Sequence, residues 1–217
     1  MVRSSWFLLA LCAVLSAGVL TLFYRKLQPV EPIFPHSERT VVAGSITTPT
    51  VTFVNPQKGD KYAALTVVLF SDFGCSHCKQ FSDAFAALPT SIRNNVRLVW
   101  KHAPSGAENP LSKTFSIASA CAANQGDFWG FHDTLFAAQP LAAEADLSRI
   151  AVSLSLDETV FKNCLETQNT LPLIDRDIDE AIGLGLRATP TFFIGQERFE
   201  GAYTTDALAE LFETHLK

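Results

Sequence analysis

The pair Cys75 and Cys78, spaced as C-x-x-C, is the feature of the sequence best suited to chemistry. It directly follows the apolar run 65–70 and precedes an amphipathic stretch over 79–88, so it lies where a strand would meet a helix. Two thiols one helical turn apart share a face and are close enough to form a disulfide. The spacing therefore predicts a dithiol that exchanges electrons with other thiols.

The expected helix start gives the two cysteines different roles. The free N–H groups and positive dipole end of a helix that begins near Cys75 would stabilise its thiolate, so Cys75 is predicted to be the nucleophile. Cys78 is then the resolving thiol. Ser76 and His77 lie between them, and His77 can add positive charge or a hydrogen bond that favours the thiolate. Such a thiolate makes the oxidised pair more reactive, which favours a disulfide donor.

A C-x-x-C pair can also be half of a zinc site, or an inert pair. Structural zinc needs about four ligands and normally brings a second close pair. Cys121 and Cys164 stand far apart in the sequence, and no histidine neighbours either of them at ligand spacing. His102, His132 and His215 lack partners at metal spacing and are predicted to be packing or surface residues. We therefore expect neither a metal nor an organic cofactor.

The N-terminal segment 1–26 predicts export. An uncharged run extends from Ser4 to Tyr24, between Arg3 and the pair Arg25 and Lys26. It is long enough to span a bilayer and somewhat long for a signal peptide, so an uncleaved anchor is favoured over a cleaved signal. Either one places the remainder in the bacterial cell envelope, in the periplasm or on the extracytoplasmic face of the inner membrane.

A proline-rich linker over 27–44 and one folded domain over 45–217 are expected to follow this segment. The chain has 217 residues, which is enough for one ordinary domain and an appendage. Its net charge is −5 and its Lys and Arg residues are scattered, so the sequence carries no electrostatic footprint for nucleic acid.

The hydrophobic periodicity predicts an α/β fold. The run Leu65 to Phe70 is nearly continuous in apolar and β-branched residues, so it is expected at the centre of the sheet, covered on both faces. A helix with Phe81, Phe85 and Leu88 inward joins it to a strand over 96–100, which makes a βαβ unit. Further strands are expected over 51–54, before a turn at 55–60, and in a hairpin over 191–200.

A block of helices is expected between these strands, over about 108–186. Its helix starts are predicted from the capping residues Asn109, Asp127, Asp146 and Asp157. Ile174, Ile178 and Ile182 mark its last helix, and a final helix with Leu208, Leu211 and Phe212 inward closes the chain. The order is β-α-β, helices, β-β-α, which is the thioredoxin fold with an all-helical insertion, preceded here by an N-terminal hydrophobic helix.

From about Val51 to its C-terminus the chain resembles the DsbA-like family of thioredoxin-fold thiol-disulfide oxidoreductases. The matching residues are Phe70 to Phe73 before the cysteines, Arg97 to His102 on the next strand, Ala118 to Ala122 with Gly126, Phe128–Trp129 and His132–Asp133 in the insertion, and Ala188 to Phe193. Together these motifs are more specific than C-x-x-C alone.

The resemblance implies further site residues. Thr189 and Pro190 would form a cis peptide that faces the dithiol and binds an extended substrate chain, although Pro190 can also be a simple turn or strand-start proline. Cys121 and Cys164 would form a structural disulfide, with two separate buried thiols as the alternative. Asp72 lies close to the dithiol in the sequence and can either transfer protons or have a turn or capping role.

The predicted function is that of a monomeric disulfide donor to reduced or misoxidised protein substrates. The resemblance implies a quinone-linked membrane reoxidase as its partner. A reductase or isomerase of the same fold is the alternative, since Thr189 is compatible with isomerase-type relatives, although 28–64 is too short for their dimerisation domain. A non-catalytic binding module is a third possibility, and the intact Cys75, Cys78 and Pro190 argue against it.

Overall fold

The computed structural model describes residues 44–139 and 143–217. These residues belong to a compact unit over Val41–Lys217. The expected N-terminal hydrophobic segment 1–26 and the linker, apart from Gly44, lie outside the described residues. Across the described part of the chain, no helix has both the length and the apolar character needed to cross a membrane.

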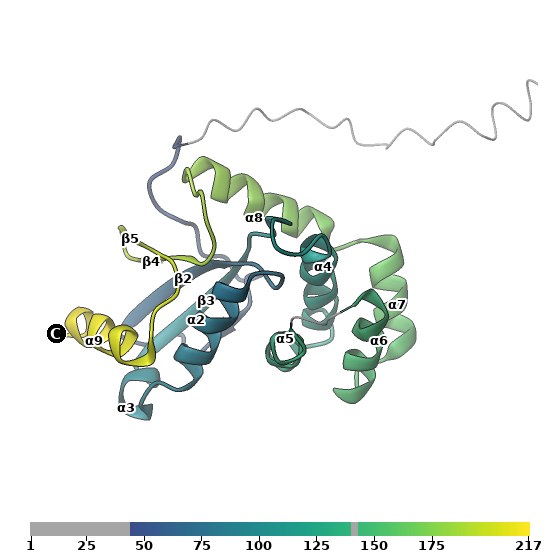
Figure 1. The fold of residues 1–217 in the computed structure, drawn as a ribbon, viewed down its shortest axis with the longest axis horizontal. Helices are drawn as coiled ribbons and strands as arrows, with labels where there is room; N and C mark the ends of the chain where they lie inside the picture. The colour runs from purple at the N-terminus through teal and green to yellow at the C-terminus, as the bar shows by residue number, and fades with distance from the viewer. Residues whose placement is uncertain (1–43, 140–142) are drawn as a thin grey trace, which may run out of the picture. The chain divides into compact units, whose positions relative to one another are not determined.

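A five-stranded mixed sheet forms the centre of this unit (Figure 1), with the strand order β1-β3-β2-β4-β5. Strand β2 pairs in parallel with β3 and antiparallel with β4, and the two edge strands are antiparallel to their neighbours. The strands are β1 (Gln57–Lys58), β2 (Leu65–Ser71), β3 (Val96–His102), β4 (Thr191–Ile194) and β5 (Glu197–Glu200). The predicted place of the 65–70 strand at the centre is confirmed.

Strand β2 is apolar throughout because both of its faces are covered. Val67 and Leu69 pack into the main core, which also holds Phe81 and Phe212. The alternate residues Val68 and Phe70 point to the other face, where they pack with Leu184 and Phe193. Residues two apart in a strand share one face, so a strand buried on both sides needs an unbroken apolar run.

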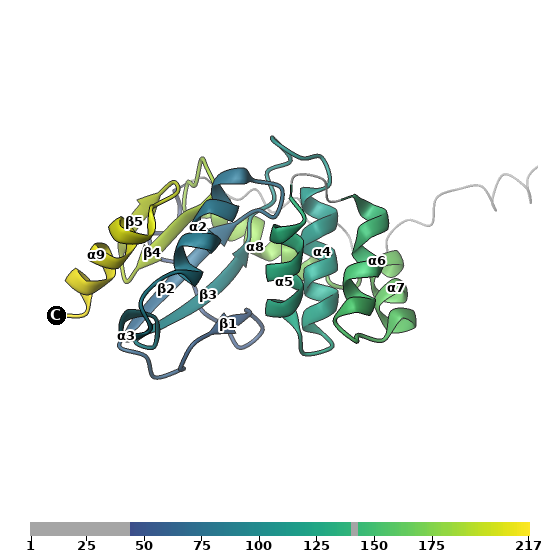
Figure 2. The same cartoon turned by 60° about the horizontal axis from the view of Figure 1, so that its bottom comes forward.

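Helices cover the sheet on both faces, and the insertion extends beyond its β3 side (Figure 2). Helices α2 and α9 lie on one face, and α8 crosses the other. The helices are α2 (Ser76–Ala86), α3 (Thr90–Arg93), α4 (Ser112–Ala123), α5 (Phe128–Ala137), α6 (Glu144–Ser153), α7 (Glu158–Thr167), α8 (Leu171–Gly183) and α9 (Thr205–His215). The predicted thioredoxin fold with a helical insertion is confirmed.

Two of the four predicted helix starts are found as expected. Asp127 caps α5 by accepting the N–H of Gly130, and Asp157 caps α7 in the same way. Asp146 is not a cap, because α6 begins at Glu144 and the Asp146 carboxylate reaches back to the N–H of Ala143. The cap predicted at Asn109 is also wrong, since this residue forms a turn ahead of α4, which begins at Ser112.

The strand predicted over 51–54 is wrong. Thr52 donates both its backbone N–H and its hydroxyl to the Asn55 side chain, and this local bonding folds the segment into a turn. The edge strand is instead β1, inside the stretch 55–60 that was predicted as a turn. There Gln57 pairs with Val99 and its carbonyl accepts the indole N–H of Trp129 at 2.7 Å.

A buried charge cluster, formed by Lys101, Asp177 and Glu180, links α8 to the sheet. The Lys101 ammonium on β3 is fully buried, 3.3 Å from Asp177 and 2.7 Å from Glu180, both on α8. Asp177 also accepts the N–H of His102 at 3.0 Å. Glu180 accepts the Thr50 hydroxyl at 2.7 Å, so the segment before the sheet is tied to the same helix. Every member of this cluster therefore has a partner from another element.

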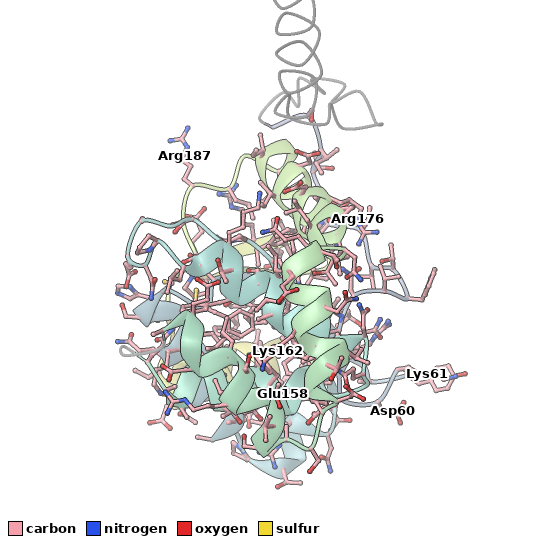
Figure 3. The ribbon with its side chains drawn as sticks, turned by 90° about the vertical axis from the view of Figure 1, so that its right-hand side faces the viewer. Asp60, Lys61, Glu158, Lys162, Arg176 and Arg187 are labelled. Atoms are coloured by element: carbon pink, nitrogen blue, oxygen red, sulfur yellow. A yellow bond between two sulfur atoms is a disulfide. The ribbon has the colours of Figure 1, made fainter. Side chains whose placement is uncertain are left out.

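Other charged side chains lie on the surface (Figure 3). Glu158 and Lys162 on α7 are 2.6 Å apart, and each is about half exposed. Arg176 of α8 and Arg187, which follows this helix, lie at the surface of the protein. Exposed pairs contribute little to stability because water screens them, so the buried cluster is the stronger restraint on α8.

Candidate active site

The two cysteines lie at the junction of β2 and α2, as predicted. Cys75 is the N-cap residue of α2, and Cys78 follows in the first turn of the helix. Both are free thiols and both are nearly buried, with exposed fractions of 4% and 1%. The N–H of Asp72 donates to the Cys78 sulfur at 3.3 Å. Cys75 is therefore the outer and Cys78 the inner member of the pair.

The surroundings of the pair shift the pKa values of the two thiols in opposite directions. Hydrogen bonding from the Cys78 thiol, aided by the Cys78 N–H, lowers the pKa of Cys75 to about 6, against the opposing effect of burial. Burial raises the pKa of Cys78 well above its ordinary value, and the neighbouring Cys75 sulfur adds to this. At neutral pH the dithiol thus holds a Cys75 thiolate beside a Cys78 thiol, which suits a nucleophile and a resolving group.

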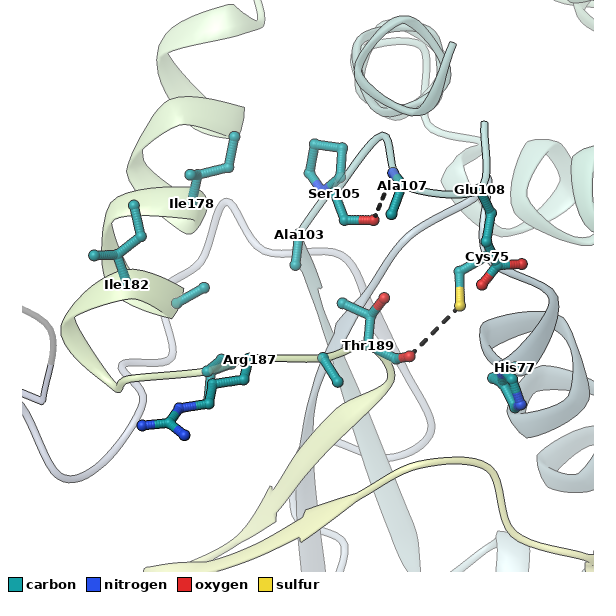
Figure 4. A pocket seen from close by; sticks show the side chains of 14 residues that line it. Cys75, His77, Ala103, Ser105, Ala107, Glu108, Ile178, Ile182, Arg187 and Thr189 are labelled. Carbon is teal, nitrogen blue, oxygen red and sulfur yellow. Dashed lines mark hydrogen bonds between the residues drawn. The ribbon is translucent and has the colours of Figure 1, made fainter. Parts of the chain in front are cut away.

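Thr189 and Pro190 face the dithiol, although more than a hundred residues separate them from it in the sequence. The bond between them is cis, and the Thr189 carbonyl oxygen lies 3.5 Å from the Cys75 sulfur (Figure 4). Strand pairing brings them there, because Thr191 at the start of β4 pairs with Phe70 near the end of β2. The structure thereby brings together all the residues predicted for the catalytic and substrate-binding site.

Asp72 holds a loop against the dithiol. Its buried carboxylate accepts the Gly74 N–H at 2.8 Å, and also the N–H and hydroxyl of Ser105 at 2.9 and 3.0 Å. Gly74 lets the backbone before Cys75 pass close to Ser112 at the start of α4, since a Cβ on residue 74 would collide with the Ser112 hydroxyl. Of the two roles considered for Asp72, these hydrogen bonds support the structural one, in which its carboxylate holds a turn.

Glu108 in the same loop is a site residue that sequence reasoning missed. Its carboxylate accepts the N–H of Ser76, the first residue of α2, at 3.0 Å. This hydrogen bond lowers the pKa of Glu108, and the charge of His77 lowers it further. Glu108 is 33 residues from Cys75 in a segment without periodicity, so no local pattern marks it.

Side-chain atoms of Cys75, His77 and Glu108 lie within 4.8 Å of one another, and we do not assign this group as a metal site. Structural zinc sites use about four ligands, so this trio falls one short of that number. His77 and Glu108 are exposed, whereas Cys75 is buried.

A pocket of about 510 Å³ opens beside Cys75. Cys75, His77 and Glu108 lie on one side of it, and Ile178 and Ile182 of α8 lie on the other (Figure 4). Its remaining lining comes from Ala181 of α8, from the loop after β3 and from residues 186–189, which end at the cis peptide. The reactive sulfur thus borders a largely apolar groove.

Comparison with known proteins agrees with this geometry. Residues 54–214 match the family described as Thioredoxin. The chain belongs to the thioredoxin family. Its fold, with the helical insertion, is the DsbA-like one.

Two solved structures illustrate the similarity. A thioredoxin-like oxidoreductase from Silicibacter pomeroyi is 26% identical, with a TM-score of 0.67 over 75% of this chain and 92% of that one. Oxidised BdbD from Bacillus subtilis is 23% identical, with a TM-score of 0.66 over 81% of this chain and 98% of that one, and it shares the fold.

A curated relative is a Na⁺/H⁺ antiporter, NhaA 3 of Salinispora tropica. It is 36% identical over 152 residues, which make up 70% of this chain and 23% of the antiporter. The chain therefore spans about a quarter of the length of the curated relatives it matches.

The remaining predicted site cysteines, Cys121 and Cys164, lie in the helical insertion. Cys121 of α4 and Cys164 of α7 are joined by a disulfide, with their Cα atoms 5.8 Å apart. Neither lines the pocket beside Cys75. The bond therefore links two helices of the insertion and takes no part in the dithiol.

His102, His132 and His215 were expected to be packing or surface residues. His102 and His132 are buried, and burial lowers the pKa of both, that of His102 to about 3. His132 packs edge-on against Trp100, with ring centroids 5.0 Å apart. His215 is half-buried, and its ring lies 2.8 Å from the Leu211 carbonyl of the same helix. None of the three lines the pocket beside Cys75.

Proposed function

We propose that this protein is a thiol-disulfide oxidoreductase of the cell envelope whose Cys75–Cys78 disulfide is donated to reduced protein substrates. The observation that carries the proposal is the unequal pair of thiols at the start of α2. The pKa of Cys75 is lowered to about 6, while that of Cys78 is raised. One sulfur is thereby prepared to leave as a thiolate and the other to hold a proton.

The reaction consists of two exchanges. A substrate thiolate attacks the Cys75 sulfur of the oxidised enzyme, the Cys75–Cys78 bond breaks, and the electron pair goes to Cys78, which takes up a proton. A second substrate thiolate then attacks the substrate sulfur of the mixed disulfide, and Cys75 leaves as a thiolate. The substrate loses two electrons and becomes a disulfide, while the enzyme becomes the dithiol.

The lowered pKa of Cys75 favours this direction of electron flow. At pH 7, a thiol with a pKa of about 6 is mostly ionised. Its ionisation stabilises the reduced enzyme about tenfold over one with an unperturbed thiol, which raises the reduction potential by ~30 mV. Stabilising the reduced form makes the disulfide the better oxidant.

The groove beside Cys75 suits an unfolded polypeptide. Ile178, Ile182 and Leu186 offer apolar contact with little side-chain selectivity. Pro190 has no N–H, and the half-buried Thr189 next to it keeps a carbonyl close to the reactive sulfur. An extended chain can pair with that backbone and bring its own cysteine to Cys75. The substrates we propose are therefore reduced or misoxidised proteins.

Three features support a location outside the cytoplasm. The uncharged run from Ser4 to Tyr24 is suited to export or anchoring. The Cys121–Cys164 disulfide is of a kind that persists in oxidising compartments. The antiporter relative joins a similar domain to a membrane transporter. We propose the extracytoplasmic face of the inner membrane, with a quinone-linked membrane protein as the reoxidase.

The reduction potential of the full-length chain, kept in mild detergent and equilibrated with glutathione, tests the direction of electron flow. We expect a potential well above the thioredoxin value of about −270 mV, and faster oxidation of a reduced two-cysteine peptide than reduction of insulin. A potential at or below the thioredoxin value would instead support the reductase or isomerase alternative. Inactivity in both assays would support a binding module.

A further inference from the structure

Glu108 lies at the point where the active-site helix begins. Its carboxylate oxygen is 3.0 Å from the Ser76 nitrogen, and its reactive atoms lie within 4.8 Å of those of Cys75 and His77 (Figure 4). The Ser76 N–H is one of the free donors at the N-terminus of α2. The Glu108 carboxylate therefore accepts a hydrogen bond from one of the backbone N–H groups at the start of α2, beside the reactive Cys75 sulfur.

The loop that carries Glu108 is fixed by contacts on both sides of this residue. Before it, Ser105 is bound to the buried carboxylate of Asp72 through two hydrogen bonds. After it, Asn109 accepts the N–H of Leu111 at 2.9 Å, and the carbonyl of Asn109 accepts the Ser112 hydroxyl at 2.8 Å. The carboxylate is thus held above the helix start, although its side chain is exposed.

The position of Glu108 opposes the stabilisation of the thiolate. Free N–H groups and the positive end of a helix dipole favour a thiolate, and a carboxylate that accepts one of those N–H groups weakens both effects. Its own negative charge also repels the thiolate. We propose that Glu108 destabilises the Cys75 thiolate and thereby limits the oxidising strength of the dithiol.

The electrostatics of the neighbouring groups agree with this role. The Glu108 side chain raises the pKa of Cys75, against the larger lowering effect of Cys78. The Ser76 N–H keeps the pKa of Glu108 low, so the carboxylate stays ionised at neutral pH. His77 faces Glu108 from α2, and its positive form would offset part of the repulsion.

Two substitutions separate the charge of Glu108 from its hydrogen bond. Glu108→Gln removes the charge and keeps an acceptor for Ser76, whereas Glu108→Ala removes both. A charge within 4.8 Å acting through water predicts that Glu108→Gln lowers the pKa of Cys75 by about half a unit. At pH 7 this shifts the glutathione equilibrium about threefold toward the reduced enzyme, or ~14 mV. Glu108→Ala should shift both quantities further in the same direction.

The test uses the full-length chain, thiolate absorbance at 240 nm against pH, and the glutathione equilibrium at low salt and at 1 M salt. High salt should shrink the effect of Glu108→Gln, because the side chain is exposed and screened. Glu213→Gln, an exposed position on α9, is the matched control and should change neither quantity. Glu108→Gln keeps the acceptor for Ser76, so its oxidised form should unfold within about 1 kcal/mol of the wild type, which separates this role from a structural one.

This inference rests on the proposed function, because it assumes that Cys75 is the redox nucleophile. The two can nevertheless fail separately. If the wild type does not exchange with glutathione, the proposed function fails. If it does exchange, and both Glu108 variants match Glu213→Gln in the pKa of Cys75 and in the equilibrium constant, the role of Glu108 is overturned alone.

Discussion

Replacing Lys101 with methionine tests how much the buried charge cluster contributes to holding α8 on the sheet. Lys101 is fully buried, with its ammonium 3.3 Å from Asp177 and 2.7 Å from Glu180. Methionine keeps much of the side-chain length but removes the cation, so two carboxylates lose their main partner. Breaking a buried pair in this way costs about 3–5 kcal/mol, which lowers the melting temperature by roughly 6–20 °C. Urea unfolding at pH 7.5 measures the loss.

The dependence of this loss on pH identifies its cause. Burial already raises the pKa of Asp177, with Lys101 acting against it. Without Lys101 the pKa of Asp177 rises further, and the folded state then binds a proton more readily than the unfolded state. A carboxyl with a raised folded pKa destabilises the protein above that pKa, and protonation relieves the penalty as the pH falls through it. The deficit of Lys101→Met should therefore be smaller at pH 4.5 than at pH 7.5.

Lys113→Met provides the matched control. Lys113 of α4 pairs with Asp175 of α8 at 3.0 Å, but both side chains are about half exposed, so the loss should be at most about 1 kcal/mol. Adding Asp177→Asn to Lys101→Met should restore part of the stability, because the amide oxygen can still accept the N–H of His102. The reasoning is refuted if Lys101→Met costs no more than Lys113→Met, or if its deficit is equal at both pH values.

Three further outcomes are expected at the cysteines. Cys78→Ser should accumulate a mixed disulfide with a test peptide whose cysteine is already in a disulfide with thionitrobenzoate, because the Cys75 thiolate attacks the peptide sulfur and thionitrobenzoate leaves. The product is visible by non-reducing electrophoresis, whereas Cys75→Ser should trap none. Alkylation of Cys75 in the reduced wild type should accelerate with a midpoint near pH 6. Because its folded pKa is lowered, Cys75 stabilises the reduced form fully above the unfolded pKa near 9, and this stabilisation is lost as the pH falls through about 6. Removing the Cys121–Cys164 bond, which closes a loop of 43 residues, should cost up to about 4 kcal/mol in urea unfolding. Four free thiols among these cysteines in the denatured protein without reductant would contradict that bond.

The parts of the fold that follow from local patterns were predictable from the sequence. The C-x-x-C pair, the apolar run of β2, and the caps Asp127 and Asp157 each depend on residues within a few positions of one another. Their physical causes are helical spacing, strand alternation and side-chain bonding to the next turn, which act over that range. The placement of Thr189 came from family resemblance, because no local pattern brings it to Cys75.

The failures have physical causes too. Val51 to Val54 is apolar enough for a strand, but the Asn55 side chain competes for the backbone of Thr52 and bends it into a turn. Asp146 was a plausible cap, but its carboxylate bonds backward to Ala143 from inside the helix. Glu108 could not be found at all, because its role depends on a loop that Asp72 brings to the dithiol from far along the chain.

Three segments distant in the sequence surround the reactive dithiol: the cis peptide, the loop with Glu108, and α8. Each is positioned by contacts that do not involve the Cys75 sulfur. The pairing of Phe70 with Thr191 places the cis peptide. Asp72 places the loop with Glu108, and the Lys101 cluster places α8, which forms the far wall of the groove. The identity of the C-x-x-C residues is therefore only one determinant of the potential and the substrate contacts. A substitution at Asp72 should alter the pKa of Cys75 through the loop, whereas one at Lys101 should alter the groove and leave that pKa nearly unchanged.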